Sequence, residues 1–228
     1  MEDTFSIRGV LETAADLYAE HGRFVSFANL AEATGVSEEA LCDEFGTVDQ
    51  LVTRYYVDLV DRCRETVESL APPSAEERAG AFAFIMLDLL EERPDFVRAT
   101  FRSYAAAFGS GFRSRLDQTV GFVLDAPDVS GLNQAVLTSA PFSFPTVDIF
   151  VRLLDTWRGD TSDGRQRSTA LLDKVLRFYA GLATSPTLAD GVDVVRYTAE
   201  AGYLPRIPFL TDWLLGSDEP ESEPADNA

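Results

Sequence analysis

Apolar side chains recur every third or fourth residue along most of this 228-residue chain, which is the spacing of one face of an α-helix. The clearest example is the series Leu51, Tyr55, Leu59, Cys63 and Val67, which advances in steps of four residues. No segment alternates apolar and polar residues in the way that a half-buried strand requires. The spacing therefore predicts an all-α fold.

Capping residues and helix breakers divide this pattern into separate segments. Ser26, Ser37 and Thr47 each precede a segment and are placed to cap it, and Gly22 and Gly35 follow segments as natural stops. Prolines separate the later segments at positions 94, 127, 141, 145, 186 and 205. The pattern predicts helices at residues 5–21, 27–34, 38–45, 47–70, 75–92, 95–108, 111–124, 131–139, 145–158, 165–184 and 188–202.

The first 52 residues carry the most specific pattern, two short helices joined by a glycine turn and followed by a long helix. Val10–Gly22 (VLETAADLYAEHG) is similar to the first helix of TetR-family regulators, and Phe27–Val52 (FANLAEATGVSEEALCDEFGTVDQLV) resembles their helix-turn-helix and the entry into their fourth helix. Gly35 permits the positive φ of a tight turn. The matching residues are Leu30, Ala31, Gly35, Val36, Ser37, Leu41, Phe45, Thr47, Asp49 and Leu51.

The resemblance implies an architecture and a function. It implies a three-helix helix-turn-helix domain at 1–50, joined by a long helix to a larger helical ligand-binding and dimerisation domain at 51–216. It also implies a TetR-like transcriptional regulator that binds operator DNA as a homodimer through 165–184 and 188–202, which would otherwise be ordinary core helices of a monomer. The DNA-binding residues implied by position are Ser26, Ser37, Glu38, Glu39, Ala40, Cys42, Asp43 and Thr47.

The chain departs from the family where DNA contacts are made. Family members carry a tyrosine at the position of Cys42 and a lysine at that of Val48, and these two side chains normally contact phosphates. Residues 1–50 hold two arginines against eleven acidic residues, a balance of 2 − 11 = −9. One alternative is that this surface still binds DNA, because multimolar salt weakens the counterion contribution for every protein and carboxylates can accept hydrogen bonds from cytosine amino groups. The other alternative is that DNA binding is lost and the scaffold acts as a ligand- or protein-binding module.

The charge of the whole chain is also strongly negative. There are 38 Asp and Glu residues against 19 Lys and Arg, a net charge of −19, and Lys174 is the only lysine. Acidic residues spread along the whole chain favour a surface adapted to multimolar salt, and the rival interpretation is a protein that binds basic partners. Residues 217–228 (SDEPESEPADNA) are expected to form a disordered acidic tail.

The same composition bears on localisation. The acidic start Met1–Thr4 is unlike a secretory signal, and no apolar run is long enough for a spanning helix. Cys42 and Cys63 have no partners at metal-ligand spacing, so we expect reduced thiols. These features predict a cytoplasmic protein that does not contact the membrane.

Aromatic residues of the larger domain are the candidates for a ligand cavity. The chain has sixteen phenylalanines, enough to line an apolar pocket, although aromatics at helical spacing also occur as plain core. The segment 140–145 is expected to be a bent apolar connector between helices. A small apolar ligand in this pocket would favour one tilt of the helix at 47–70. The candidate ligand-binding residues are Phe82, Met86, Phe101, Tyr104, Phe108, Phe142 and Phe144.

No pattern in the sequence indicates catalysis. There is no nucleophile elbow, phosphate-binding loop, zinc-ligand spacing or paired-carboxylate signature. His21 is expected to cap a helix end, and the acidic segment 160–164 lacks the spacing and the closing glutamate of a calcium loop. The sequence therefore predicts no enzyme activity, no cofactor and no metal site.

Overall fold

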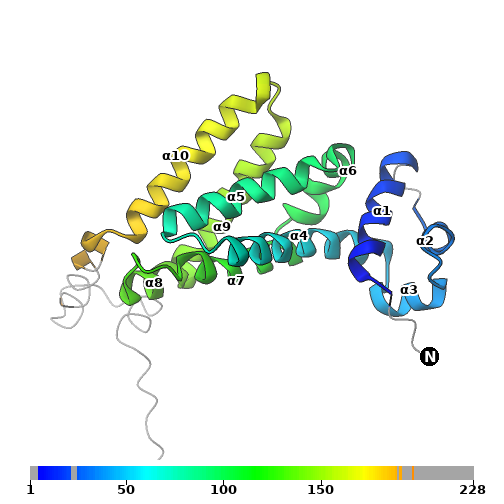
Figure 1. The fold of residues 1–228 in the computed structure, drawn as a ribbon, viewed down its shortest axis with the longest axis horizontal. Coiled ribbons are helices and arrows are strands. Elements are labelled where there is room, and N and C mark those ends of the chain that lie inside the picture. The colour runs from blue at the N-terminus through cyan, green and yellow to red at the C-terminus, as the bar shows by residue number, and fades with distance from the viewer. Residues whose placement is uncertain (1–4, 22–24, 189, 192–196, 198–228) are drawn as a thin grey trace, which may run out of the picture. The chain divides into compact units, whose positions relative to one another are not determined.

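The computed structural model describes residues 5–21, 25–188, 190–191 and 197, and every regular element in this part of the chain is helical (Figure 1). The all-α prediction is therefore confirmed for these residues. A π-helical turn (Phe101–Ala105) and a short 3₁₀ turn (Asp163–Arg165) accompany the α-helices. The α-helices are α1 (Ile7–His21), α2 (Phe27–Thr34), α3 (Glu38–Phe45), α4 (Val48–Leu70), α5 (Ala75–Glu91), α6 (Pro94–Thr100), α7 (Gly111–Leu124), α8 (Gly131–Thr138), α9 (Ala140–Gly159) and α10 (Gln166–Ala183).

The predicted caps form at the starts of α2, α3 and α4. The side-chain oxygens of Ser26, Ser37 and Thr47 each accept a hydrogen bond of 3.2 Å from the backbone N–H three residues later. Gly35 ends α2 with a φ of 73°, and its N–H donates to the carbonyl of Ala31 at 2.8 Å. These local signals were sufficient to locate both ends of α2 and the starts of the next two helices.

Helix α4 connects the α2–α3 pair to the larger helical part of the chain. Helices α2 and α3 lie at its N-terminal end (Figure 1), Arg8 of α1 reaches Asp58 and Glu65 of α4, and α5 and α7 also pack on α4. Tyr56 of α4 is fully buried among Phe96, Phe101 and Phe112, and its hydroxyl forms a 2.7 Å hydrogen bond with Thr100. One continuous hydrophobic core therefore extends from α1 to α10, and the predicted boundary at residue 50 falls inside α4.

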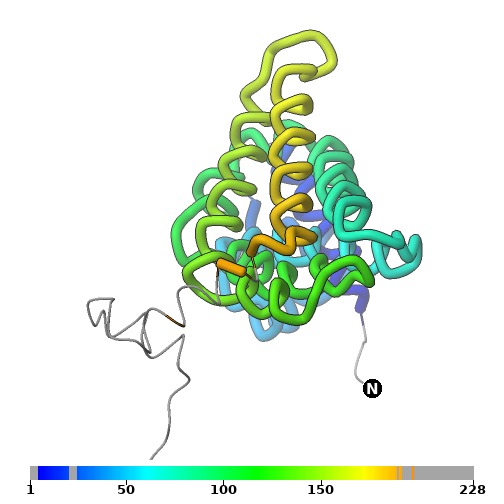
Figure 2. Tube along the Cα trace, turned by 90° about the vertical axis from the view of Figure 1, so that its left-hand side faces the viewer, coloured from blue at the N-terminus to red at the C-terminus, as the bar shows by residue number. Residues whose placement is uncertain are grey.

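Helix α10 lies between α5 and α9 (Figure 2) and also contacts α8. Its inner face buries Leu172, Ala180 and Ala183, and the side-chain amide of Asn133 in α8 donates to the Ala183 carbonyl at 2.8 Å. The outer face leaves Phe178 exposed. One face of α10 thus completes the core, and the other carries apolar side chains without cover in this part of the chain.

The predicted connector at 140–145 is wrong, because these residues form the first turns of α9. Pro141 stands in the first turn, where a missing N–H removes no helical hydrogen bond. The Ser139 carbonyl accepts the N–H groups of Phe142 and Ser143, each at 2.9 Å. Pro145 lies inside the helix and removes a single bond near its start, so the helix continues.

The predicted helix at 95–108 is also interrupted. α6 ends at Thr100, and a π-helical turn follows, closed by a 2.8 Å hydrogen bond from the N–H of Ala106 to the carbonyl of Phe101. Gly109, with a φ of 74°, then redirects the chain into α7. A π-helical turn leaves no signature in the spacing of apolar residues. The spacing therefore predicted one continuous helix over 95–108.

Internal contacts divide the chain into residues 1–184 and residues 185–228. In the second unit, the Ser185 hydroxyl accepts the N–H of Thr187 at 3.2 Å, in the manner of a helix start. The predicted helix at 188–202, apart from residues 188, 190, 191 and 197, and the acidic tail at 217–228 lie outside the described residues. None of the helices that the structure describes is long and apolar enough to cross a lipid bilayer.

Candidate ligand cavity and helix-turn-helix surface

Every charged side chain on the surface formed by α2 and α3 is acidic. Residues 25–50 contain six acidic residues and no lysine or arginine, and all six side chains are exposed. On α2 and α3 themselves these are Glu32, Glu38, Glu39, Asp43 and Glu44, and none of them makes an ion pair within the described part of the chain. The surface therefore presents uncompensated negative charge to its surroundings.

The residues implied for DNA contact are three helix caps and five residues of α3. Ser26, Ser37 and Thr47 are the capping residues of α2, α3 and α4, so their side-chain oxygens are already engaged with the backbone. The remaining five belong to α3, where Glu38, Glu39, Cys42 and Asp43 are exposed and Ala40 is half-buried. Beneath this surface, Leu30 and Leu41 are buried and fix α2 against α3.

Elsewhere the arginines neutralise carboxylates in pairs. Arg8 contacts Asp58 at 3.2 Å, and Arg93 forms a two-pronged contact with Asp16 at 2.7 and 3.2 Å. The hydrogen bond that the Arg93 guanidinium donates to Asp16 raises the pKa of Arg93. These pairs tie α1 to α4 and to the start of α6, whereas the charged residues of α2 and α3 lack such neutralisation.

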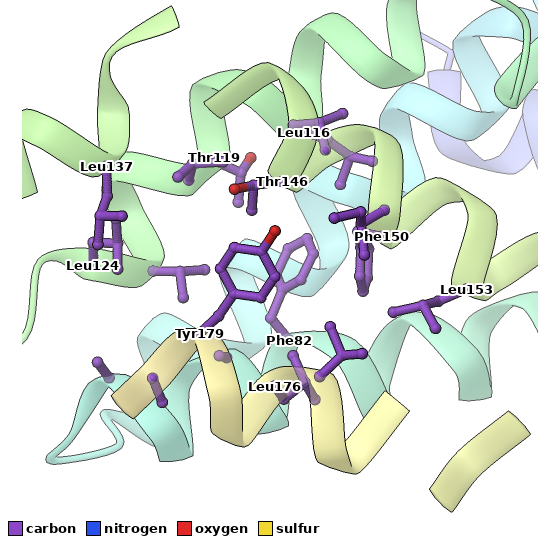
Figure 3. Close-up of a pocket in the computed structure, with 18 residues that line it drawn as sticks. Phe82, Leu116, Thr119, Leu124, Leu137, Thr146, Phe150, Leu153, Leu176 and Tyr179 are labelled. Atoms are coloured by element: carbon purple, nitrogen blue, oxygen red, sulfur yellow. The ribbon is translucent and has the colours of Figure 1, made fainter. Parts of the chain in front are cut away.

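The larger part of the bundle contains a partly open apolar cavity of about 130 Å³ (Figure 3). Its walls are contributed by α5, α7, α8, α9 and α10. Phe82 and Phe150 both line it and pack on each other, with ring centroids 6.1 Å apart. The remaining lining consists of alanine, valine, leucine and isoleucine side chains together with Thr119, Thr146 and Tyr179.

Three hydroxyl groups are the polar features of this lining. The Thr119 hydroxyl donates to the Arg115 carbonyl at 2.8 Å, and the Thr146 hydroxyl donates to the Phe142 carbonyl at 2.7 Å. Figure 3 shows the ring of Tyr179 reaching from α10 into the cavity, with its hydroxyl directed towards the side where the two threonines lie. Among the described residues that line the cavity, none is charged.

Of the seven predicted ligand-binding residues, the structure brings only Phe82 into the described lining. Met86 and Phe101 are buried in the core without reaching the cavity. Phe101 packs on Phe112 with ring centroids 6.1 Å apart. Tyr104 is half-buried, and its hydroxyl bonds Asp49 at 2.5 Å. These three residues thus serve packing and helix contacts.

The other three predicted residues are at the surface. Phe108 is 83% exposed, Phe144 is 54% exposed, and their rings meet at 6.0 Å in an edge-to-face contact. Phe142 is 37% exposed. Because α9 begins at Ala140 rather than at Pro145, Phe142 and Phe144 are carried on the outer side of its first turns, and Phe108 lies in the connection before α7. The helix start therefore explains why Phe142 and Phe144 miss the cavity.

Sequence reasoning missed most of the aliphatic and hydroxyl-bearing lining residues, which lie on α5, α7, α8, α9 and α10. Val175, Leu176 and Tyr179 fall within the range 165–184 that the resemblance assigns to the dimer, and they line the cavity. On the same helix Leu171 and Phe178 are 45% and 67% exposed. Tyr179 lies one position from Phe178, and a helix turns about 100° per residue. The apolar spacing alone does not reveal which of two apolar stripes faces inward.

A second hollow of about 560 Å³ lies at the surface beside Trp157. Three of its four charged side chains, Glu91, Asp160 and Arg165, already have partners. Arg165 contacts Glu91 and lies 4.0 Å above the Trp157 ring. Asp160 accepts backbone N–H groups from Ser162 and Ser168, each at 2.9 Å, and the bond from Ser162 contributes most to a strongly lowered pKa. Most of the charged groups of this hollow therefore already have partners within the protein, and the apolar cavity is the better candidate for a ligand site.

Comparison with known proteins does not assign the chain to a family. The chain matches no known protein-family model, and no curated protein is similar enough to it to count as a match. The described residues also contain no group of three or more His, Cys, Asp or Glu side chains able to hold a metal ion. The function must therefore be argued from the cavity and from the surface of α2 and α3.

Proposed function

We propose that the chain is a TetR-like transcriptional regulator of a salt-rich cytoplasm, which binds operator DNA as a homodimer and a small apolar ligand in the cavity. The observation that carries the proposal is one continuous core joining two parts, the capped pair α2–α3 and the apolar cavity. A regulator needs both a DNA-reading element and a ligand site on one chain.

The geometry of α2 and α3 supports the DNA-reading half of the proposal. Ser37 caps α3 and leaves the first turn of that helix exposed, with Glu38 and Glu39 at its positive end. In helix-turn-helix proteins the start of the second helix contacts base edges in the major groove. Carboxylates can accept hydrogen bonds from the cytosine amino group. At multimolar salt the repulsion between these carboxylates and phosphates is screened within a few ångströms.

The position of the cavity supports the ligand-sensing half. Two of its walls, α5 and α7, also pack directly on α4, whose first turn follows α3 after Gly46 and Thr47. Gly111 lets α7 approach α4 closely, since an added Cβ would lie 3.3 Å from side-chain atoms of Thr53 and Val57. A ligand that moves α5 or α7 would therefore also bias α4 and the α2–α3 pair at its end.

A second candidate function follows from the charge on the same surface. The exposed carboxylates of α2 and α3 without ion pairs repel DNA phosphates at ordinary salt. On this alternative, α2 and α3 are retained as a scaffold that contacts a basic protein, and the cavity keeps its ligand. The two candidates differ in what binds α3, and one experiment separates them.

The experiment selects sequences from a random-sequence duplex DNA library with the full-length protein, at about 0.1 M and at multimolar potassium chloride. The regulator predicts enrichment of a near-palindromic sequence, because a twofold dimer presents two copies of α3. The double variant Glu38→Gln/Glu39→Gln should abolish or alter that enrichment, since it changes the acceptors in the first turn of α3.

A matched control exists in α5. Ser74 caps this helix, and Glu76 and Glu77 stand in its first turn, one position further from the cap than Glu38 and Glu39 in α3. The variant Glu76→Gln/Glu77→Gln should keep the wild-type enrichment, because it makes the same chemical change away from α3. If folded, dimeric wild-type protein enriches no sequence at either salt concentration, DNA binding is excluded and the second candidate stands.

A further inference from the structure

The polar groups of the cavity define the chemistry of its ligand more narrowly than its apolar walls do. Each threonine hydroxyl has one hydrogen, and Thr119 and Thr146 have both committed theirs to carbonyls of their own helices. Each oxygen keeps lone pairs that can accept a hydrogen bond. Thr119 is only 2% exposed, so bulk water hardly reaches it. The two threonines therefore offer acceptors to whatever occupies the cavity.

Tyr179 supplies the complementary group. Its hydroxyl makes no hydrogen bond to any described residue, although it points into the cavity (Figure 3). A phenol hydroxyl both donates and accepts one hydrogen bond. It is therefore the donor that the lining can offer, and it stands opposite two acceptors. A ligand group that satisfies all three must itself donate and accept, which is the property of a hydroxyl.

The lining also excludes charged ligands. Among the described lining residues none carries charge, and moving an unpaired ion from water into an apolar site is strongly unfavourable. The volume of about 130 Å³ is close to that of an engineered apolar cavity of about 150 Å³ that holds benzene. Size and polarity together point to one ring and one hydroxyl.

We infer that the cavity binds an uncharged, single-ring compound bearing a hydroxyl group, with Tyr179 donating to the ligand oxygen and Thr119 or Thr146 accepting its hydrogen. This inference rests on the proposed function of the cavity as a ligand site and specifies its ligand class. It assigns specificity to three residues on three helices, α7, α9 and α10.

The test is isothermal titration of the full-length protein with phenol, toluene and benzoate. Phenol and toluene have the same ring and nearly the same size, so they differ in the hydroxyl alone. We expect phenol to bind about fivefold more tightly than toluene, the effect of about one net hydrogen bond. Benzoate should show no binding at concentrations that saturate with phenol, because its carboxylate has no partner.

Variants connect the preference to named groups. Tyr179→Phe should bring the phenol-to-toluene ratio close to one while toluene affinity stays unchanged. The double variant Thr119→Val/Thr146→Val, which removes both acceptors, should do the same. The matched control is Thr156→Val, because Thr156 also lies on α9 and also donates to a carbonyl four residues earlier, at 2.8 Å, but does not line the cavity. That control should retain the fivefold preference.

The outcomes separate this inference from the proposal on which it rests. Equal binding of phenol and toluene, unaffected by Tyr179→Phe, would overturn the assignment of a hydroxyl-bearing ligand while leaving the cavity a ligand site. Preferred binding of benzoate would overturn the exclusion of charge. If none of the three compounds binds to folded protein, the cavity is not a ligand site of this size, and the proposed function fails with the inference.

Discussion

The hydroxyl of Tyr104 donates a hydrogen bond of 2.5 Å to Oδ1 of Asp49, 55 residues earlier in the chain. Tyr104 belongs to the π-helical turn Phe101–Ala105, and Asp49 lies in the first turn of α4, directly after the α3–α4 junction. π-helical turns within helices often mark functional positions. Here the hydrogen bond joins the π-helical turn to the first turn of α4, where the α2–α3 pair meets the rest of the bundle.

The first prediction concerns this bond. Tyr104→Phe removes the hydroxyl and should lower the free energy of unfolding by about 0.5–1 kcal/mol, the range for a charge-assisted bond that solvent still reaches. Urea denaturation measures the change. Tyr179→Phe is the matched control, since it removes a hydroxyl that bonds no described residue, and it should leave stability unchanged. Equal effects of the two variants would contradict the account.

The bond also predicts a dependence on pH. The hydrogen bond to Asp49, aided by burial, raises the pKa of Tyr104 from 10.0 to about 12. A raised pKa in the folded protein means that the stabilisation is complete below pH 10 and is lost as pH rises towards 12. The stability difference between wild type and Tyr104→Phe should therefore shrink across this interval. Tyr55, whose burial raises its pKa to about 12, affects both proteins equally.

The measurement is urea denaturation of both proteins at intervals between about pH 9 and about pH 12. A stability difference that stays constant over the whole interval would show that the Tyr104 hydroxyl does not hold its proton through Asp49. A difference that grows with pH would reverse the expected sign and contradict the assigned donor.

Substitution by alanine should change the stability of the protein in opposite directions at two glycines. Gly35→Ala should destabilise by about 1 kcal/mol, because its φ of 73° is unfavourable for a side chain. Gly80→Ala in α5 should stabilise by about 0.4–1 kcal/mol, because it restricts the unfolded chain at a helical position. At both sites the added Cβ would meet no atom within 4 Å beyond the adjoining chain, so the two sites differ in backbone conformation. Thermal unfolding of the two variants tests the turn directly.

The placement of the phenylalanines gives a further contrast. Phe82 is 6% exposed and lines the cavity, whereas Phe108 is 83% exposed. Phe82→Ala should cost about 3–5 kcal/mol of unfolding free energy, and Phe108→Ala less than about 1 kcal/mol. Chemical denaturation of the pair distinguishes them. Similar losses in both variants would mean that Phe108 is buried in solution, as the sequence-based prediction of a cavity residue requires.

The predictions from sequence succeeded where the signal is local. Ser37 caps α3 and Gly35 ends α2 because a cap needs only the residue and the backbone N–H groups next to it. The four-residue series from Leu51 to Val67 likewise predicted the buried side of α4, and all five of its members are buried. Capping and helical spacing thus defined most of the elements.

The predictions failed where the answer depends on packing between helices. Tyr179 and Phe178 are adjacent aromatic residues, and only the contact of α10 with α5 and α9 determines that the first faces the cavity. Pro145 usually ends a helix, but it is tolerated in α9 close to the N-terminus. The DNA-binding assignments of α3 depend on a partner and stay a prediction.

The central claim is that the cavity and the α2–α3 pair act on one another. It is tested by titrating an enriched DNA duplex with full-length protein, with and without saturating phenol, while following fluorescence anisotropy. We predict at least an approximately fivefold change in the Kd for DNA, and the same factor for phenol when DNA is present. Val175→Phe, which places a ring in the cavity from α10, should abolish the response. Unchanged DNA affinity under phenol that is shown to occupy the cavity would contradict the account.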